Sequence, residues 1–167
     1  MSTVRKLRLP TDPDSSKAAY FRALRWLTAR ELSEAQVKKR LANRGYSDAA
    51  IGPAVARLIQ ERTIDDRRTA TAVARTEAEV RRHGSRRVMR KLLSLQIDRG
   101  LAKEVIADLF GDKDEDELLE AALTRRLRGN PGRLTDPRES RKVLAYLVRQ
   151  GFSPAAAQRA IRNRSKR

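Results

Sequence analysis

One stretch near the C-terminus decides the fold: residues 143–154 read VLAYLVRQGFSP. Val143 and Leu147 lie eight and four residues before Gly151, so they fall on one face of a helix. Glycine commonly follows the last residue of a helix, because it adopts a left-handed conformation at little cost, and here Phe152 comes directly after it. The serine and proline that follow are typical of the start of another helix. The stretch therefore predicts two helices that share an apolar core around a tight turn.

The pattern recurs at two other glycines, Gly45 and Gly100, which are followed by the apolar residues Tyr46 and Leu101. Five and nine positions beyond the residue after each glycine, the chain is again apolar, at Ile51 and Val55, Ile106 and Phe110, and Ala157 and Ile161. Three equivalent helix ends are therefore predicted.

The middle unit departs from the pattern. The other two glycines have apolar residues four and eight positions before them, whereas Gly100 has Gln96 and Leu92. The helix before Gly100 is therefore expected to be about one turn longer than its equivalents and to run over residues 85–99.

The spacing of the glycines predicts a repeat. They are 55 and 51 residues apart, and a period of about fifty is typical of stacked supersecondary units. An earlier helix is expected in each unit, over residues 19–30, 65–83 and 116–128. The predicted fold is all-α, with three tandem three-helix repeats stacked into an elongated, curved body. The predicted boundaries are a basic tail at 1–17 and repeats at 18–63, 64–112 and 113–167. The alternative is one globular bundle whose helix ends share a spacing by chance.

Capping residues mark several helix starts. Ser33 and Gln36 have the spacing of a capping box, in which each side chain bonds a free backbone N–H. Ser47, Asp136 and Ser153 are further predicted N-caps. Asp65-Asp66 could be a carboxylate pair for acid–base chemistry, but two acids at a helix start are better explained by capping.

The charge of the chain points to a polyanionic partner. Its 167 residues carry 38 Lys and Arg against 21 Asp and Glu, a formal net charge of +17. Residues 104–120 hold eight acids and one base, whereas residues 121–167 hold 13 bases and two acids. Such a surface attracts nucleic acid or an acidic protein face.

The composition also excludes several classes of protein. Cysteine is absent, which rules out disulfides, zinc fingers and thiol chemistry. No apolar run approaches the roughly 20 residues that a spanning helix needs, and residues 1–14 lack the apolar core of a signal peptide. We expect a soluble, cytoplasmic protein that does not bind membranes.

Catalytic and cofactor sites are not predicted. His83 is the only histidine, and the arginines around it oppose its protonation, so we expect an exposed residue at a helix end. Residues 129–132, GNPG, form a turn without the lysine of a phosphate-binding loop. The chain is therefore expected to be a binding protein without a cofactor, not an enzyme.

A calcium site is not predicted either. Asp112, Asp114 and Asp116 imitate the start of a calcium loop, but Glu117 and Leu123 replace its glycine and its bidentate glutamate. This acidic stretch is expected to be a linker in which Asp114, with Glu117, caps the next helix.

The equivalent helix of each repeat carries cations beside its apolar residues. The cations are expected to point away from the core. The candidate partner- or DNA-binding residues are Lys38, Lys39, Arg40, Arg44, Arg86, Arg87, Arg90, Lys91, Arg138, Arg141, Lys142, Arg149 and Arg162. One such helix is often only solvated, but three in equivalent positions indicate a binding surface.

Four segments carry a resemblance to a known family. They are residues 23–37, ALRWLTARELSEAQV; residues 64–67, IDDR; residues 84–88, GSRRV; and residues 146–153, YLVRQGFS. In this order they resemble the RecX family, regulators of the RecA recombinase, over about residues 18–164. Thr69 departs from the family pattern, because an aromatic residue is usual there, and the displaced middle repeat is a second departure.

The resemblance implies an all-α fold of three tandem three-helix repeats. It also implies a protein that lies in the groove of the RecA–DNA filament and limits filament extension, ATP hydrolysis and strand exchange. The expected partners are the RecA filament and single- and double-stranded DNA without sequence preference, and the expected state is a monomer.

The alternative is a general DNA- or RNA-binding protein. Residues 41–58 can be read as a helix-turn-helix whose recognition helix spans residues 48–58. That helix offers only Arg57, with Gln60 nearby, to read base edges, which is little for direct readout.

Overall fold

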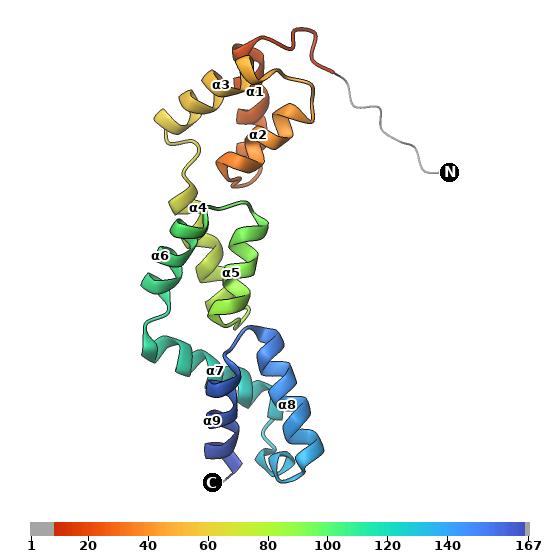
Figure 1. Ribbon diagram of the computed structural model, residues 1–167, viewed down its shortest axis with the longest axis vertical. Helices are drawn as coiled ribbons and strands as arrows, with labels where there is room; N and C mark the ends of the chain where they lie inside the picture. The colour runs from red at the N-terminus through yellow and green to blue at the C-terminus, as the bar shows by residue number, and fades with distance from the viewer. Residues whose placement is uncertain (1–8, 166–167) are drawn as a thin grey trace, which may run out of the picture. The chain divides into compact units, whose positions relative to one another are not determined.

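The structure is a computed structural model that describes residues 9–165, apart from the side chains of residues 112–114. Every regular element of the described residues is helical, and three helices follow one another in each repeat (Figure 1). They are α1 (Ser16–Leu27), α2 (Glu34–Ala42) and α3 (Asp48–Gln60); α4 (Asp66–Arg75), α5 (Ser85–Ser94) and α6 (Arg99–Leu109); and α7 (Asp112–Leu127), α8 (Pro137–Gln150) and α9 (Pro154–Ser165). A π-helical turn, η1 (Thr76–Val80), follows α4, and a 3₁₀ turn, η2 (Pro131–Thr135), precedes α8. The predicted all-α fold of three three-helix repeats is confirmed.

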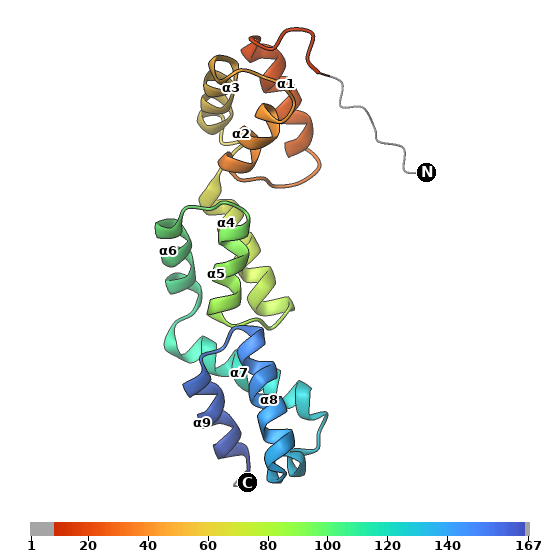
Figure 2. The same cartoon turned by 45° about the vertical axis from the view of Figure 1, so that its right-hand side comes forward.

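The chain forms two compact units. The first extends to Thr69 and includes Leu95–Ile97, and the second contains Ala70–Ser94 and the residues from Asp98 onward. Helices α1, α2 and α3 pack together in the first unit, and α7, α8 and α9 pack together in the second (Figures 1 and 2).

The core of the first unit is built from the predicted apolar positions. Val37 and Leu41 of α2 are fully buried, together with Val55 and Leu58 of α3. Small residues of α1, among them Ala19, are buried against them, which lets the helices approach closely. The predicted capping box starts α2, because the Gln36 N–H donates to Ser33 Oγ and the Ser33 N–H donates to Gln36 Oε1, both at 3.2 Å.

The third repeat has the same construction in the second unit. Val143, Leu147 and Phe152 are buried in one cluster with Leu123 of α7 and Ala157 of α9. The predicted caps are in place, since the side chains of Asp136 and Ser153 accept from the Arg138 and Ala156 N–H groups. Gly151 follows α8 in the left-handed region, with φ of 101°.

The middle repeat corrects one prediction. Helix α5 ends at Ser94 rather than at residue 99, and Gly100 lies in the first turn of α6. The left-handed residue that follows α5 is Gln96, with φ of 60°. Counted from Gln96, the middle repeat has the same register as its neighbours: Val88 and Leu92 are the buried residues eight and four positions earlier, and Ile97, Ala102 and Val105 are buried beyond it.

The start of α7 also differs from prediction. Helix α7 begins at Asp112, with Gly111 at its N-cap, so the acidic stretch is the start of a helix and Asp114 is not a cap. Acids in the first turns of a helix are favoured by its dipole.

At α4, Asp65 caps as predicted, because its carboxylate accepts from the Arg68 N–H at 2.8 Å. Asp66 has a different role: it accepts from the Glu34 N–H at 2.8 Å, at the start of α2.

Equivalent hydrogen bonds join consecutive repeats. In the first unit, Ser33, the N-cap of α2, donates through Oγ to the Leu95 carbonyl at 2.6 Å. In the second unit, the Gly84 N–H, at the start of α5, donates to the Gln150 carbonyl at 2.9 Å. Leu95 and Gln150 are equivalent, because each directly precedes the left-handed residue that follows the second helix of its repeat.

The second junction requires two glycines. A Cβ at Gly84 would lie 2.7 Å from the Gly151 carbonyl carbon and the Phe152 nitrogen. A Cβ at Gly151 would lie 2.5 Å from the Cβ and the nitrogen of Arg87. Both positions are therefore closed to larger residues unless the backbone moves.

We predict that Gly151→Ala destabilises the protein more than Gly129→Ala does. Both glycines have positive φ, 101° and 76°, but a Cβ at Gly129 meets nothing within 4 Å. Gly129→Ala should therefore cost only the left-handed penalty of about 1–2 kcal/mol. Gly151→Ala should cost about 1–3 kcal/mol more, because it also forces the junction apart. Chemical denaturation measures both, and equal losses would contradict the close approach.

Gln96→Gly should stabilise the protein by up to about 1 kcal/mol, since glycine removes the left-handed strain at some entropic cost in the unfolded chain. Lys103→Gly, at an exposed position inside α6, is the control and should destabilise by about 1 kcal/mol. Thermal unfolding of both variants tests the assignment. If Gln96→Gly destabilised the protein, Gln96 would not be the equivalent of Gly45 and Gly151 in the middle repeat.

Candidate functional site

The candidate cations of the first unit lie on and just beyond α2. Lys38 pairs with Glu34 at 2.6 Å, and Arg40 lies over the Trp26 ring, 5.9 Å from its centroid. Lys39 is exposed and Arg44 is half-buried. Lys38 and Lys39 also line an open cavity of about 400 Å³ whose other wall is the start of α3. Of these four residues, Lys39 is the one most available to a partner.

The cations of α5 divide into two kinds. Arg86 and Arg90 are exposed on the side of the helix opposite the buried Val88. Arg87 is half-buried and donates to the Arg149 carbonyl at 3.3 Å and to Gln150 Oε1 at 3.4 Å. Lys91 is half-buried as well. Arg86 and Arg90 are therefore available to a partner, whereas Arg87 holds the junction.

The remaining candidates lie on α8 and α9. Arg138, Arg141, Lys142 and Arg149 are exposed on α8, and Arg162 is exposed on α9. Lys142 bonds Glu139 at 2.8 Å, and Arg141 bonds the Pro137 carbonyl at 3.2 Å within its own helix. Lys142 and Arg133 lower the pKa of Glu139 to about 2. One candidate cation, Lys142, is thus partly neutralised by its neighbour.

The second unit brings the cations of α5 and α8 together. The C-terminus of α8 meets the N-terminus of α5, and Arg87 bonds the carbonyl of Arg149 there. The exposed cations Arg149 and Arg86 flank this junction, where the Arg86 N–H donates to the Gly151 carbonyl at 3.2 Å. We call the exposed cations of these two helices the α8–α5 cationic surface; they are Arg86, Arg90, Arg138, Arg141, Lys142 and Arg149.

The helix-turn-helix reading finds little support at its recognition helix, α3. The Arg57 side chain is held by Glu61 at 2.8 Å and stacks on Tyr20, 4.2 Å from the ring centroid. The residue that was to read bases is thus already engaged within the fold. Gln60 is exposed at the end of the helix.

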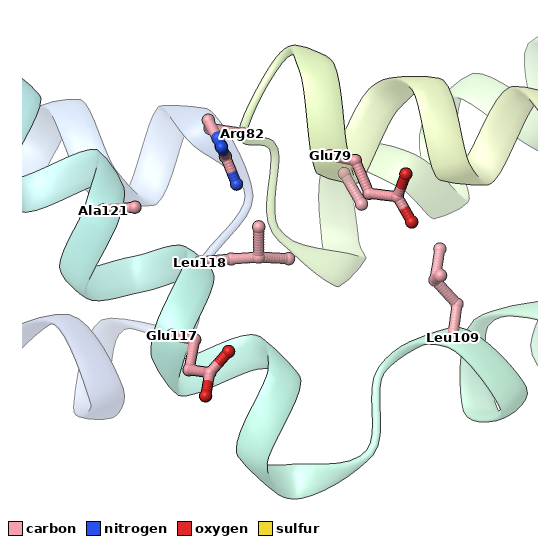
Figure 3. A pocket seen from close by; sticks show the side chains of 7 residues that line it. Glu79, Arg82, Leu109, Glu117, Leu118 and Ala121 are labelled. Atoms are coloured by element: carbon pink, nitrogen blue, oxygen red, sulfur yellow. The ribbon is translucent and has the colours of Figure 1, made fainter.

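An acidic cavity in the second unit was not predicted from the sequence. It has a volume of about 480 Å³, and its walls come from η1, from Arg82 two residues beyond η1, and from helices α6 and α7. Figure 3 shows Leu109 and Leu118 facing it, with Glu79 and Arg82 at its edges. Its charged residues include two acids, Glu79 and Glu117, against one base, so the cationic character of the second unit is confined to part of its surface.

His83 is not the exposed residue that the sequence predicted. It is 7% exposed, and its Nδ1 lies 2.7 Å from Oε2 of the buried Glu77 in the π-helical turn. Arg81 pairs with the other oxygen of Glu77 at 3.0 Å. Burial lowers the pKa of His83 below its ordinary value of 6.5, although the bond to Glu77 opposes this effect. This pair could not be predicted from the sequence, because the path of the five residues between its members depends on the π-helical turn.

The described residues offer neither a metal site nor a membrane-spanning helix. Among side chains outside residues 112–114, no three His, Asp or Glu residues gather as metal ligands would. None of the helices in residues 9–165 combines the length and the apolar composition that crossing a bilayer requires.

We predict that the protein becomes less stable as the pH decreases below about 6.5, and that His83 contributes to this loss of stability. The unfolded chain protonates His83 at its ordinary pKa of 6.5, whereas the folded chain does so only at lower pH. Its stabilising contribution is therefore complete above pH 6.5 and is lost as pH falls through the folded pKa. Urea unfolding of the wild type and of His83→Gln, between about pH 7 and about pH 5, measures the difference. Equal pH dependence in both proteins would contradict a depressed pKa.

The family of the chain is shown by comparison with known proteins. Residues 19–58 match the model of the first three-helix domain of RecX, and residues 114–161 match that of the third. Regulatory protein RecX of Halorhodospira halophila is 31% identical over 139 residues, which cover 83% of each chain. Regulatory protein RecX of Mycobacterium leprae is 32% identical over 147 residues, covering 86% of this chain and 84% of the relative.

A solved structure has the same fold. The crystal structure of RecX from Lactobacillus salivarius superposes with a TM-score of 0.80 at 20% identity, over 92% of this chain and 99% of that one. The relatives are named as regulatory proteins and not as enzymes. Together with the three three-helix repeats, these matches show that the chain belongs to the RecX family of regulatory proteins.

Proposed function

We propose that this protein regulates the RecA recombinase negatively, by lying in the groove of the RecA–DNA filament and limiting filament extension, ATP hydrolysis and strand exchange. The observation that carries the proposal is the α8–α5 cationic surface on a member of the RecX family. The protein acts by binding, without chemistry or a cofactor of its own, in the cytoplasm and as a monomer.

The groove of a nucleoprotein filament suits such a surface because DNA phosphates line it. Long cationic side chains release condensed counterions when they neutralise phosphates, which supplies affinity without reading base sequence. Among the described residues, Arg86, Arg90 and Arg149 form no salt bridge with an acid, so a partner need not displace one. Binding to single- and double-stranded DNA is accordingly sequence-tolerant.

General binding of DNA or RNA, without a recombinase, is the competing function. It would use the same cations, so charge alone does not separate the two. Sequence-specific readout by α3 is disfavoured, because Arg57 is already engaged by Glu61 and Tyr20. The test therefore has to measure RecA inhibition and DNA binding on the same variants.

We predict that Arg86→Glu with Arg90→Glu weakens inhibition of RecA strand exchange at least about tenfold, since like-charge contacts cost several kcal/mol. Arg87 is left intact because it holds the junction. The matched control is Arg99→Glu with Lys103→Glu, two exposed cations of α6 outside the candidate surface that give the same change in net charge. The control should inhibit like the wild type, and both variants should keep the helical circular dichroism spectrum.

Salt titrations of single-stranded DNA binding complete the test. If about five phosphates are neutralised, a plot of the logarithm of the binding constant against the logarithm of the salt concentration has a slope of about −3.5. Loss of two phosphate contacts should reduce the magnitude of this slope by about 1.4. A variant that loses DNA binding but inhibits strand exchange at wild-type concentrations would exclude this charge as the mechanism. Equal weakening by the control pair would indicate a nonspecific charge effect and favour general nucleic-acid binding.

A further inference from the structure

Phe21 of α1 is an aromatic side chain that the fold leaves unburied. Its exposed fraction is 51%, whereas Tyr20, Tyr46 and Phe152 are all buried. It meets the Tyr20 ring edge to face, with centroids 5.2 Å apart and an interplanar angle of 80°. The Tyr20 ring is itself covered by Arg57, but no cation–π contact falls on Phe21 among the described residues. An exposed ring next to a buried one has no evident role in holding this core.

Phe21 forms one wall of an open cavity of about 450 Å³ in the first unit. Its apolar lining comes from the segment before α1, at Leu9 and Pro10, together with Ala18 and Tyr46. The cavity thus combines an accessible aromatic ring with other apolar walls, which suits a planar, largely apolar group.

The charged residues of the cavity are mainly cationic. Arg22 and Arg25 line it, against a single acid, Asp12. Arg25 lies one helical turn from both Phe21 and Arg22, so the three side chains neighbour one another on α1. Neither arginine makes a salt bridge to a described acid. The cavity therefore presents two uncommitted cations beside an exposed ring.

We infer that this cavity binds one unpaired base of a single-stranded nucleic acid, which stacks on Phe21 while Arg22 and Arg25 contact the adjacent phosphates. Sequence-tolerant single-strand sites combine these two elements, because every base has a π-face and every nucleotide a phosphate. A duplex does not supply an unstacked base. The inference rests on the proposed function only in assuming that the protein meets single-stranded DNA, and it uses a surface outside the α8–α5 cationic surface.

The test measures binding of the full-length protein to two oligonucleotides of equal length, oligothymidylate and an abasic strand with the same backbone. Phe21→Ala should weaken oligothymidylate binding about fivefold or more and leave abasic-strand binding unchanged, since only the base stacks. Phe21→Tyr should restore the affinity. Ile59→Ala, at another exposed apolar residue of the first unit, is the matched control and should bind like the wild type.

Salt titration separates the roles of the ring and the cations. Phe21→Ala should leave the log–log salt slope unchanged, while Arg22→Gln with Arg25→Gln should reduce its magnitude by about 1.4. Thermal unfolding of each variant, compared with Ile59→Ala, checks that the fold is retained.

Three results would overturn the inference. One is equal affinity of Phe21→Ala and the wild type for oligothymidylate; another is equal weakening on both oligonucleotides. The third is loss of RecA inhibition with unchanged oligonucleotide affinity, which would assign the cavity to a protein partner. Failure of the proposed function has a different signature: the α5 reversal variant would inhibit RecA normally while Phe21 still governed oligothymidylate binding.

Discussion

The close approach between consecutive repeats is the constraint on which most of the second unit depends. The start of α5 and the end of α8 meet backbone to backbone at Gly84 and Gly151, and neither position has room for a Cβ. The left-handed conformation of Gly151 turns the chain so that Phe152 enters the core while the Gln150 carbonyl accepts from Gly84. The turn at Gly151 thereby ends α8 and brings Phe152 into the core. Its contact with Gly84 also holds the second and third repeats together. It also sets the Arg149 carbonyl beside Arg87, so packing brings together the ends of the two helices that carry the α8–α5 cationic surface.

Much of this fold could be predicted from local pattern, because apolar spacing and capping act over a few residues. The capping box at Ser33 and the glycine turns at Gly45 and Gly151 are of this kind. The turn of the middle repeat escapes a prediction based on glycine, because its left-handed position holds Gln96. The apolar spacing of Val88, Leu92 and Ile97 carried the correct register and was the better guide. A core position tolerates little variation in polarity, whereas a left-handed position tolerates other residues at a modest cost.

The candidate site was less predictable, because partners of a side chain are set by tertiary contacts. Sequence indicated cations on equivalent helices, and most of them are exposed. It could not indicate that Arg87 bonds the end of α8 or that Lys142 is paired with Glu139. His83 was misjudged for the same reason, since Glu77 reaches it through a π-helical turn. The cavity beside Phe21 is formed partly by Leu9 and Pro10, residues that carried no sequence signal of their own.

The segment before α1 also has a consequence for the ends of a repeat array. In the second and third repeats, the turn after the second helix is covered by the start of the second helix of the preceding repeat, at Ser33 or Gly84. In the first repeat, the segment before α1 takes this place: Leu9 and Pro10 lie against Gly45, and the Pro13 carbonyl accepts from the Ser47 N–H. The segment before α1 thus covers the turn that follows α2. An uncovered turn would offer the same docking surface to any second copy, and open-ended stacking of copies would be the cost of losing residues 9–13.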